Sequence, residues 1–221
     1  PGHRRYFVVS MNLDLRQLDR GPRWPGWRGL APFLAWGSLV AVVFLAVYPA
    51  SNWLGSRRAE LWHFYLDTEL AIPFVPQTVW LYLSMYLLFA LPPWFVPAGA
   101  AARLGKQLIT GCVACGSIFL LLPAALGFDR MLPAEAPYRQ IFQTLHAIDA
   151  PHNLVPSLHV VFSCLIALAC ASYARAPYAW LLRVWLVAIV VSTVLVHQHH
   201  LIDVLVALLL VGALRAHWKV G

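Results

Sequence analysis

Residues 196–204 read VHQHHLIDV and place three histidines and one aspartate inside sequence that is otherwise almost entirely apolar. Ionisable side chains are costly in membrane-type sequence, so a cluster of them indicates a functional site. A second polar segment, NLVPSLH at residues 153–159, opens an earlier apolar run. We expect the two segments to meet in space.

Composition points to a membrane protein. The chain has 221 residues, of which 61% are hydrophobic and 11% are charged, and its mean hydropathy is +0.69. Soluble domains are nearer a quarter charged, so the excess of apolar sequence is expected to face lipid. The net charge of +7 comes almost entirely from arginines at the ends of apolar runs. This placement favours topology signals and lipid phosphate contacts over nucleic-acid binding.

The fold class predicted from these runs is an all-α, polytopic membrane protein with six transmembrane helices. We expect one domain over residues 29–216, a cytoplasmic N-terminal segment over 1–28 and a cytoplasmic end over 217–221. The ten residues before Met11 are set aside from the functional argument. Pro49 is expected to end the first span, residues 50–76 to form an interfacial helix, and residues 127–155 to form a long loop. The expected spans are 30–48, 78–95, 107–126, 156–173, 178–196 and 201–214.

The distribution of basic residues predicts the orientation. With the N-terminus in the cytoplasm, twelve lysines and arginines lie on the inner side and four on the outer side. This agrees with the positive-inside rule. Both polar segments then lie on the extracytoplasmic face, and the expected location is the inner membrane of a bacterium.

The histidine-rich segment predicts an oriented imidazole. His199 and Asp203 are four residues apart and can touch on one face of a helix. His200 and Asp203 are three apart and could make the same contact, so spacing alone does not choose between them. A carboxylate that accepts the proton of one ring nitrogen fixes the tautomer and leaves the other nitrogen as a nucleophile or base.

The second segment predicts an anion site. Pro156 suits the first turn of a helix, where its missing N–H costs little. Ser157 and the free amides of that turn can bind an anion, with His159 beside them. Together the two segments suggest phosphoryl transfer, in which His199 attacks phosphorus, His159 transfers the proton and arginines neutralise the phosphoryl oxygens.

At these residues the chain resembles the type 2 phosphatidic acid phosphatase superfamily of membrane lipid phosphatases and phosphotransferases. Residues 156–159 match its PSGH signature, with Leu158 in the glycine position. Ser192, His199 and Asp203 match its third signature, with Thr193 in the arginine position. The first signature is not intact; Arg130 is the first candidate for its arginine and Arg139 the second. The resemblance covers roughly residues 78–214, and its motif form is more similar to the branch that includes inositol phosphorylceramide synthases.

The resemblance implies a helical bundle and an enzyme that needs no metal or cofactor. It implies His199, His159 and Asp203 as catalytic residues, and Ser157, Arg130, Arg139 and Ser192 as phosphate ligands. The expected activity is cleavage of a phosphomonoester or pyrophosphate on a phospholipid or polyprenyl phosphate, through a phosphohistidine. The alternative is transfer of a phospho-headgroup to a lipid hydroxyl.

Other interpretations stay open at this point. His199 and Asp203 can be a buried polar pair that joins two helices. His159 and His199 can ligate a haem from facing helices, as in a non-catalytic haem-binding or transport protein. His197, His199 and Asp203 can bind zinc, although no second shell is evident. The CxxC at Cys112 and Cys115 is interpreted as small helix-packing residues.

Overall fold

The structure is a computed structural model that describes residues 21–149 and 151–218. The expectations for residues 1–20 and 219–221 lie outside these ranges. The described residues form helices, turns and one isolated bridge, which confirms the predicted all-α class. The helices are α1 (Gly26–Gly55), η2 (Asp67–Ala71), η3 (Pro76–Thr78), α2 (Val79–Leu83), α3 (Met85–Leu88), α4 (Pro92–Phe95), η4 (Ala98–Ala100), α5 (Ala101–Leu121), α6 (Tyr138–Ile148), α7 (Leu158–Tyr173), α8 (Ala176–Leu195) and α9 (Leu201–His217).

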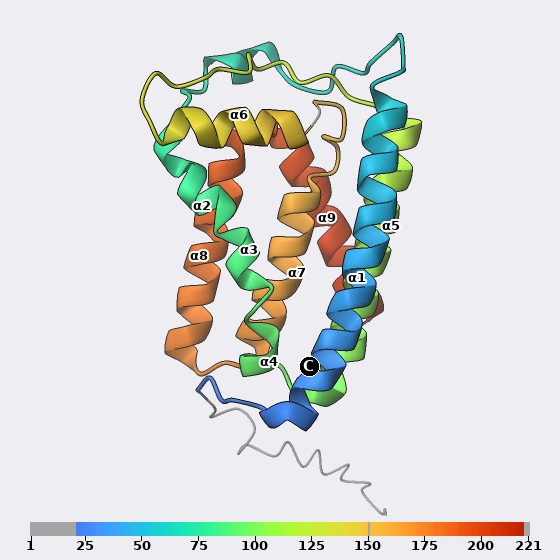
Figure 1. Cartoon of the computed structure of the whole chain (residues 1–221), viewed down its shortest axis with the longest axis vertical. Coiled ribbons are helices and arrows are strands. Elements are labelled where there is room, and N and C mark those ends of the chain that lie inside the picture. The colour runs from blue at the N-terminus through green and yellow to red at the C-terminus, as the bar shows by residue number, and fades with distance from the viewer. Residues whose placement is uncertain (1–20, 150, 219–221) are drawn as a thin grey trace, which may run out of the picture.

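The bundle is built around α7. Helices α1, α5, α7, α8 and α9 run lengthwise, the short helices α2–α4 descend beside them, and α6 lies across one end (Figure 1). Helix α7 packs against α8, α9 and α5, and most of its residues are buried. Its sequence is apolar on every side, which is the pattern of a helix surrounded by others.

Three segments are long and apolar enough to cross a membrane: α1, residues 98–121 and α8. Their composition supports the membrane character predicted from the sequence. Helix α7 is apolar throughout but has only 16 residues.

The prediction that Pro49 ends the first helix is wrong. Helix α1 continues through Pro49 to Gly55, although proline removes one helical hydrogen bond. Contacts beyond the proline support the extra turns. The Asn153 side-chain amide donates to the Tyr48 carbonyl at 3.3 Å and to Ser51 Oγ at 2.9 Å.

The expected interfacial helix over residues 50–76 is also absent from the structure. After α1 the chain runs as turns and extended segments, with short helical turns at η2 and at η3, which starts at Pro76. Trp62 exchanges backbone hydrogen bonds with the residues after α5, through Pro123 at 2.8 Å and Ala125 at 2.9 Å. These tertiary bonds replace the helical ones, so the segment lies over the end of the bundle instead of forming its own helix.

The remaining expected boundaries differ in smaller ways. The expected span over 78–95 is divided into α2, α3 and α4, and the prolines Pro92 and Pro93 open the last of these pieces. Helix α5 begins and ends about five residues earlier than expected, before Pro123. The long loop over 127–155 contains the amphipathic helix α6.

We expect Gly116→Leu to destabilise the protein by about 1–3 kcal/mol, because it overpacks the contact between α5 and α1. A Cβ at Gly116 would overlap Cγ1 of Val47. A helical valine has one strongly preferred rotamer and cannot easily move aside. The matched control is Gly212→Leu in α9, where a Cβ meets nothing within 4 Å. Thermal unfolding in detergent measures both, and equal melting temperatures for the two variants would contradict the prediction.

Candidate active site

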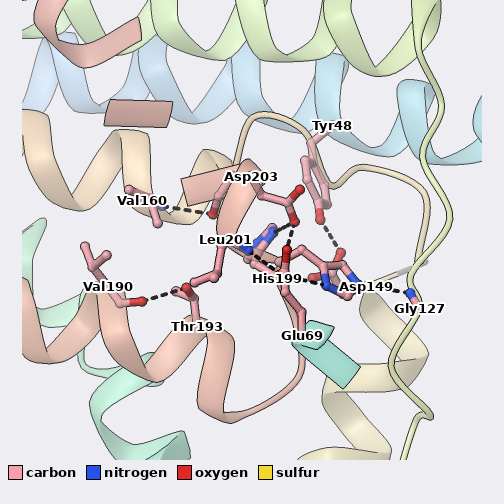
Figure 2. Close-up of polar contacts among 12 residues, drawn as sticks. Tyr48, Glu69, Gly127, Asp149, Val160, Val190, Thr193, His199, Leu201 and Asp203 are labelled. Carbon is pink, nitrogen blue, oxygen red and sulfur yellow. Dashed lines mark hydrogen bonds and ion pairs between the residues drawn. The ribbon is translucent and has the colours of Figure 1, made fainter. Parts of the chain in front are cut away.

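His199 and Asp203 form the centre of the candidate site. His199 lies in the turn between α8 and α9, and its Nδ1 is 3.1 Å from Oδ2 of Asp203 in the first turn of α9. The His199 side chain is 7% exposed and that of Asp203 is 1% exposed. Because a carboxylate accepts, Nδ1 carries the proton and Nε2 keeps a lone pair. Figure 2 shows His199 beside the Asp203 carboxylate, with Asp149 and Tyr48 close by.

The backbone holds this pair in place. The N–H groups of Gln198 and His199 both donate to the Thr193 carbonyl at 3.1 Å. The His200 N–H donates to Asp203 Oδ2 at 2.9 Å. One carboxylate oxygen therefore accepts from the imidazole and from the start of α9, where the positive end of the helix dipole favours an anion.

His200 makes different contacts, and these resolve the ambiguity left by spacing. Its Nε2 accepts from the Gly127 N–H at 3.0 Å, and its Nδ1 is 3.3 Å from Oε2 of Glu69. Both ring nitrogens are engaged, so His200 is a structural residue. The Asp203 carboxylate contacts the imidazole of His199 and only the backbone of His200.

Four aromatic rings stack in one column beside the site. Phe128 lies between His197 and His200, with ring centroids 4.0 and 4.3 Å away, and His200 stacks on Tyr65 at 4.5 Å. His197 also bonds through Nε2 to the Ile72 carbonyl at 2.9 Å. The column fixes the loops around residues 65, 72 and 128 against the turn before α9.

Helix α7 begins beside the same turn. Ser157 is its N-cap, and its Oγ accepts from the Val160 N–H at 3.2 Å. The Ser157 N–H donates to the Asp203 carbonyl at 3.1 Å, so the starts of α7 and α9 are joined directly. His159 stacks on Tyr82 with centroids 3.9 Å apart, and its buried Nε2 has no hydrogen-bond partner.

A narrow cavity of about 10 Å³ opens on His199, enough for roughly one water molecule. Two buried polar atoms of its lining residues, Nε of Arg130 and Oδ1 of Asn153, have no hydrogen-bond partner. The lining combines a cation, a carboxylate and two amides with the imidazole. Its residues are Leu126, Arg130, Asp149, Pro151, Asn153, Leu154, Gln198 and His199.

The two candidate arginines occupy different places. Arg130 lines the cavity and donates through Nη2 to the carbonyls of His146, at 3.0 Å, and Asp149, at 2.5 Å. Arg139 is exposed and bonds to the Pro133 carbonyl of its own loop. Ser192 is buried, lies outside the cavity lining and donates its hydroxyl to the Ile189 carbonyl at 2.6 Å. Ser157, the fourth predicted phosphate ligand, and His159 also lie outside the lining, so only Arg130 of the four shares the cavity of His199.

Asp149 is the charged neighbour of His199 that sequence reasoning did not select. Tyr48 of α1 donates a hydrogen bond to its Oδ1. Burial raises the pKa of Asp149, although the Tyr48 hydrogen bond and the charges of His199 and Arg130 act in the opposite direction. Burial also lowers the pKa of Arg130, and Asp149 opposes that shift. The cavity therefore carries a cation and a weakened acid side by side.

Sequence reasoning also missed Glu69, Asn153 and Gln198. Glu69 is 4% exposed and accepts from the Leu201 N–H at 2.9 Å, 132 residues away. No feature of the neighbouring sequence distinguishes Glu69 from the other acidic residues of its segment. For Asp149 and Asn153 there was a signal: Asn153 opens the second polar segment, and Asp149 lies four residues before it.

Comparison with family models, curated proteins and solved structures finds no match. Within residues 21–149 and 151–218, no group of three or more histidine, cysteine or acidic side chains is arranged to hold a metal ion.

We expect the melting temperature to fall as the pH falls below about 6.5, the ordinary histidine pKa. Burial is the main cause that lowers the pKa of His146, His152, His197 and His200. The unfolded chain therefore binds more protons at these histidines than the folded protein does. The free energy of unfolding consequently falls on acidification. The raised pKa of Asp149 has the opposite effect on stability. At pH values near that pKa, the folded protein binds more protons at Asp149 than the unfolded chain does, so acidification stabilises the folded state there.

Melting curves in detergent between about pH 8 and pH 5 measure this dependence. His197→Gln removes one of the four titrating groups and should flatten the slope. A melting temperature that is constant or that rises on acidification contradicts the prediction.

Proposed function

We propose that the protein is an integral-membrane lipid phosphate phosphatase that acts through a phosphohistidine at the extracytoplasmic face. The observation that carries the proposal is the His199–Asp203 pair, which opens on a cavity shared with Arg130. A neutral imidazole with its proton fixed on Nδ1 is a nucleophile at Nε2. A guanidinium beside it is suited to the charge of a phosphoryl group.

In the first step, Nε2 of His199 attacks phosphorus and the bond from phosphorus to the leaving oxygen breaks. His159 gives its proton to the leaving alkoxide, or to the leaving phosphate of a pyrophosphate. In the second step, a water gives a proton to His159 and attacks the phosphohistidine, and inorganic phosphate departs. The first step requires His159 to enter as the imidazolium. Its Nε2 has no hydrogen-bond partner in the described part of the chain and is therefore available for this proton transfer.

Asp203 keeps His199 in one tautomer and stabilises its positive charge in the phosphorylated state. Arg130 offers Nε, which has no partner in the folded protein, to the phosphoryl oxygens. Because the cavity holds about one water, the site must widen to admit a phosphate.

The proposed topology has six spans, formed by α1, the broken run α2–α4, α5, α7, α8 and α9. All of these run along the long axis of the bundle (Figure 1). The N-terminus lies in the cytoplasm, and α6 with the histidine-rich turn lies at the outer surface. The resemblance of the two polar segments to the phosphatidic acid phosphatase signatures supports this arrangement.

A phosphotransferase is the second candidate, and the free Oδ1 of Asn153 is as compatible with transfer as with hydrolysis. This acceptor lies in the lining of the cavity of His199, with its amide nitrogen held by Ser51 and the Tyr48 carbonyl. It suits an incoming hydroxyl of either an alcohol or water. A panel of lipid phosphates, assayed with and without alcohol acceptors, separates the two functions by comparing free phosphate with newly formed lipid.

We expect His199→Ala to reduce phosphate release to background, because the nucleophile is lost. Asp203→Asn should lower kcat by about 10⁴-fold through loss of the correct tautomer. Phosphate release from lipid phosphates in vesicles is measured in the presence of EDTA, since the mechanism uses no metal. Normal turnover by a folded His199→Ala protein would end the proposal, and strict dependence on a divalent ion would replace it with a metal site.

We expect Arg130→Ala to lower kcat/KM by about 10²–10³-fold, the usual cost of removing a group that stabilises transition-state charge. Arg139→Ala is the matched control, because this arginine is exposed and lies outside the cavity. Its activity should be nearly unchanged. The opposite ranking of the two variants would assign the phosphate to Arg139.

A further inference from the structure

A large cleft runs along α1 below the candidate site. Its volume is about 680 Å³, and its lining comes from α1, α3, α4, α5 and α7 and is mainly aliphatic and aromatic. Helix α1 packs chiefly against α5 and touches α4 and η4, which leaves its side toward α3 and α7 open. An apolar cleft between spanning helices is suited to hydrocarbon.

The outer end of the cleft lies about one helical turn beneath the candidate site on each of three walls. Phe44 stacks on Tyr48, the donor to Asp149, with centroids 5.1 Å apart. On α7, Phe162 lines the cleft and follows His159 by three residues. Met85 lines the third wall and follows Tyr82, on which His159 stacks. The outer end of the cleft therefore lies about one helical turn below the layer that contains His159 and Tyr48, neither of which lines it.

The inner end is closed near the opposite side of the bundle. Trp24 contacts Trp94 with centroids 5.3 Å apart, and the Arg23 N–H donates to the Trp94 carbonyl at 3.0 Å. Leu30 lines this end, and Phe44 of the same helix lines the outer end. At the rise of an α-helix the two are about 21 Å apart. One leaflet contributes only about 15 Å of hydrocarbon, so the cleft passes the bilayer midplane.

We propose that the cleft binds a single polyisoprenoid chain, and that the substrate of the phosphatase is a polyprenyl phosphate or pyrophosphate. This inference rests on the proposed function. The acyl chains of a diacyl lipid end near the midplane and would leave the inner half of the cleft unfilled. A long isoprenoid chain fills its whole length while its phosphate lies at the level of His199.

Gly37 offers a test that does not touch the catalytic groups. It lines the cleft about 16 Å along α1 from Tyr48, and a Cβ there meets nothing within 4 Å. Gly37→Phe therefore places a ring in the inner half of the cleft from a position where its Cβ meets no other atom. Gly212→Phe is the matched control, because Gly212 is an exposed helical glycine with equally open surroundings and does not line the cleft.

The assay compares undecaprenyl phosphate with farnesyl phosphate, whose chain fits above residue 37. We expect Gly37→Phe to lower kcat/KM at least tenfold for undecaprenyl phosphate and to leave farnesyl phosphate unchanged, while Gly212→Phe alters neither. In the His199→Ala background, native mass spectrometry should show the same selective loss of undecaprenyl phosphate binding.

If Gly37→Phe lowers activity equally for both substrates, the cleft holds a structural lipid. If the variant changes activity toward neither substrate, the cleft does not bind the substrate chain. A change in oligomeric state would show that a second copy covers it. Each of these outcomes overturns the inference. Wild-type protein that binds undecaprenyl phosphate in the cleft but releases phosphate from neither substrate would instead overturn the proposed function.

Discussion

The Asp203 carboxylate is the interaction on which the outer end of the bundle depends. It is almost fully buried, and a buried charge is tolerated only when hydrogen-bond donors surround it. Those donors are the His199 imidazole and the His200 N–H. The same residue offers its carbonyl to Ser157, so α7, α9 and the histidine-rich turn share one anchor. The contacts that orient the imidazole therefore belong to the same residue that joins the three segments.

A second buried carboxylate, that of Glu69, repeats this arrangement from the opposite side. It accepts from the Leu201 N–H and from His200, whose other nitrogen accepts from Gly127. Two neighbouring histidines thus have separate carboxylates and separate tasks. His199 opens on the cavity, while His200 ties the segment after α1 and the segment after α5 to the last helix. This division gives both buried carboxylates hydrogen-bond donors at the end of an apolar bundle.

The sequence predicted the helical class and the positions of α7, α8 and α9, because each is a continuous apolar run. It also predicted the His199–Asp203 contact, but on the assumption of a shared helix face, whereas His199 lies in the turn that precedes α9. It failed at Pro49 and over residues 50–76, where contacts with Asn153, Pro123 and Ala125 override local preference. The roles of Tyr48, Glu69 and Asp149 were missed for the same reason. Their hydrogen-bond partners lie far away in the sequence, and the spacing of residues along the chain does not reveal such pairs.

The bond between Glu69 and Leu201 joins positions 132 residues apart. The chain emerges from the ribosome with Tyr48 and Glu69 early and with the histidine-rich turn near the end. Glu69 must therefore wait for its partners until the start of α9 has been synthesised, whereas Tyr48 needs only Asp149, which precedes α7. Maturation of the outer cluster is consequently a late, cooperative step of biogenesis, and a nascent chain that stops short of the last helix carries an uncompensated glutamate at its surface.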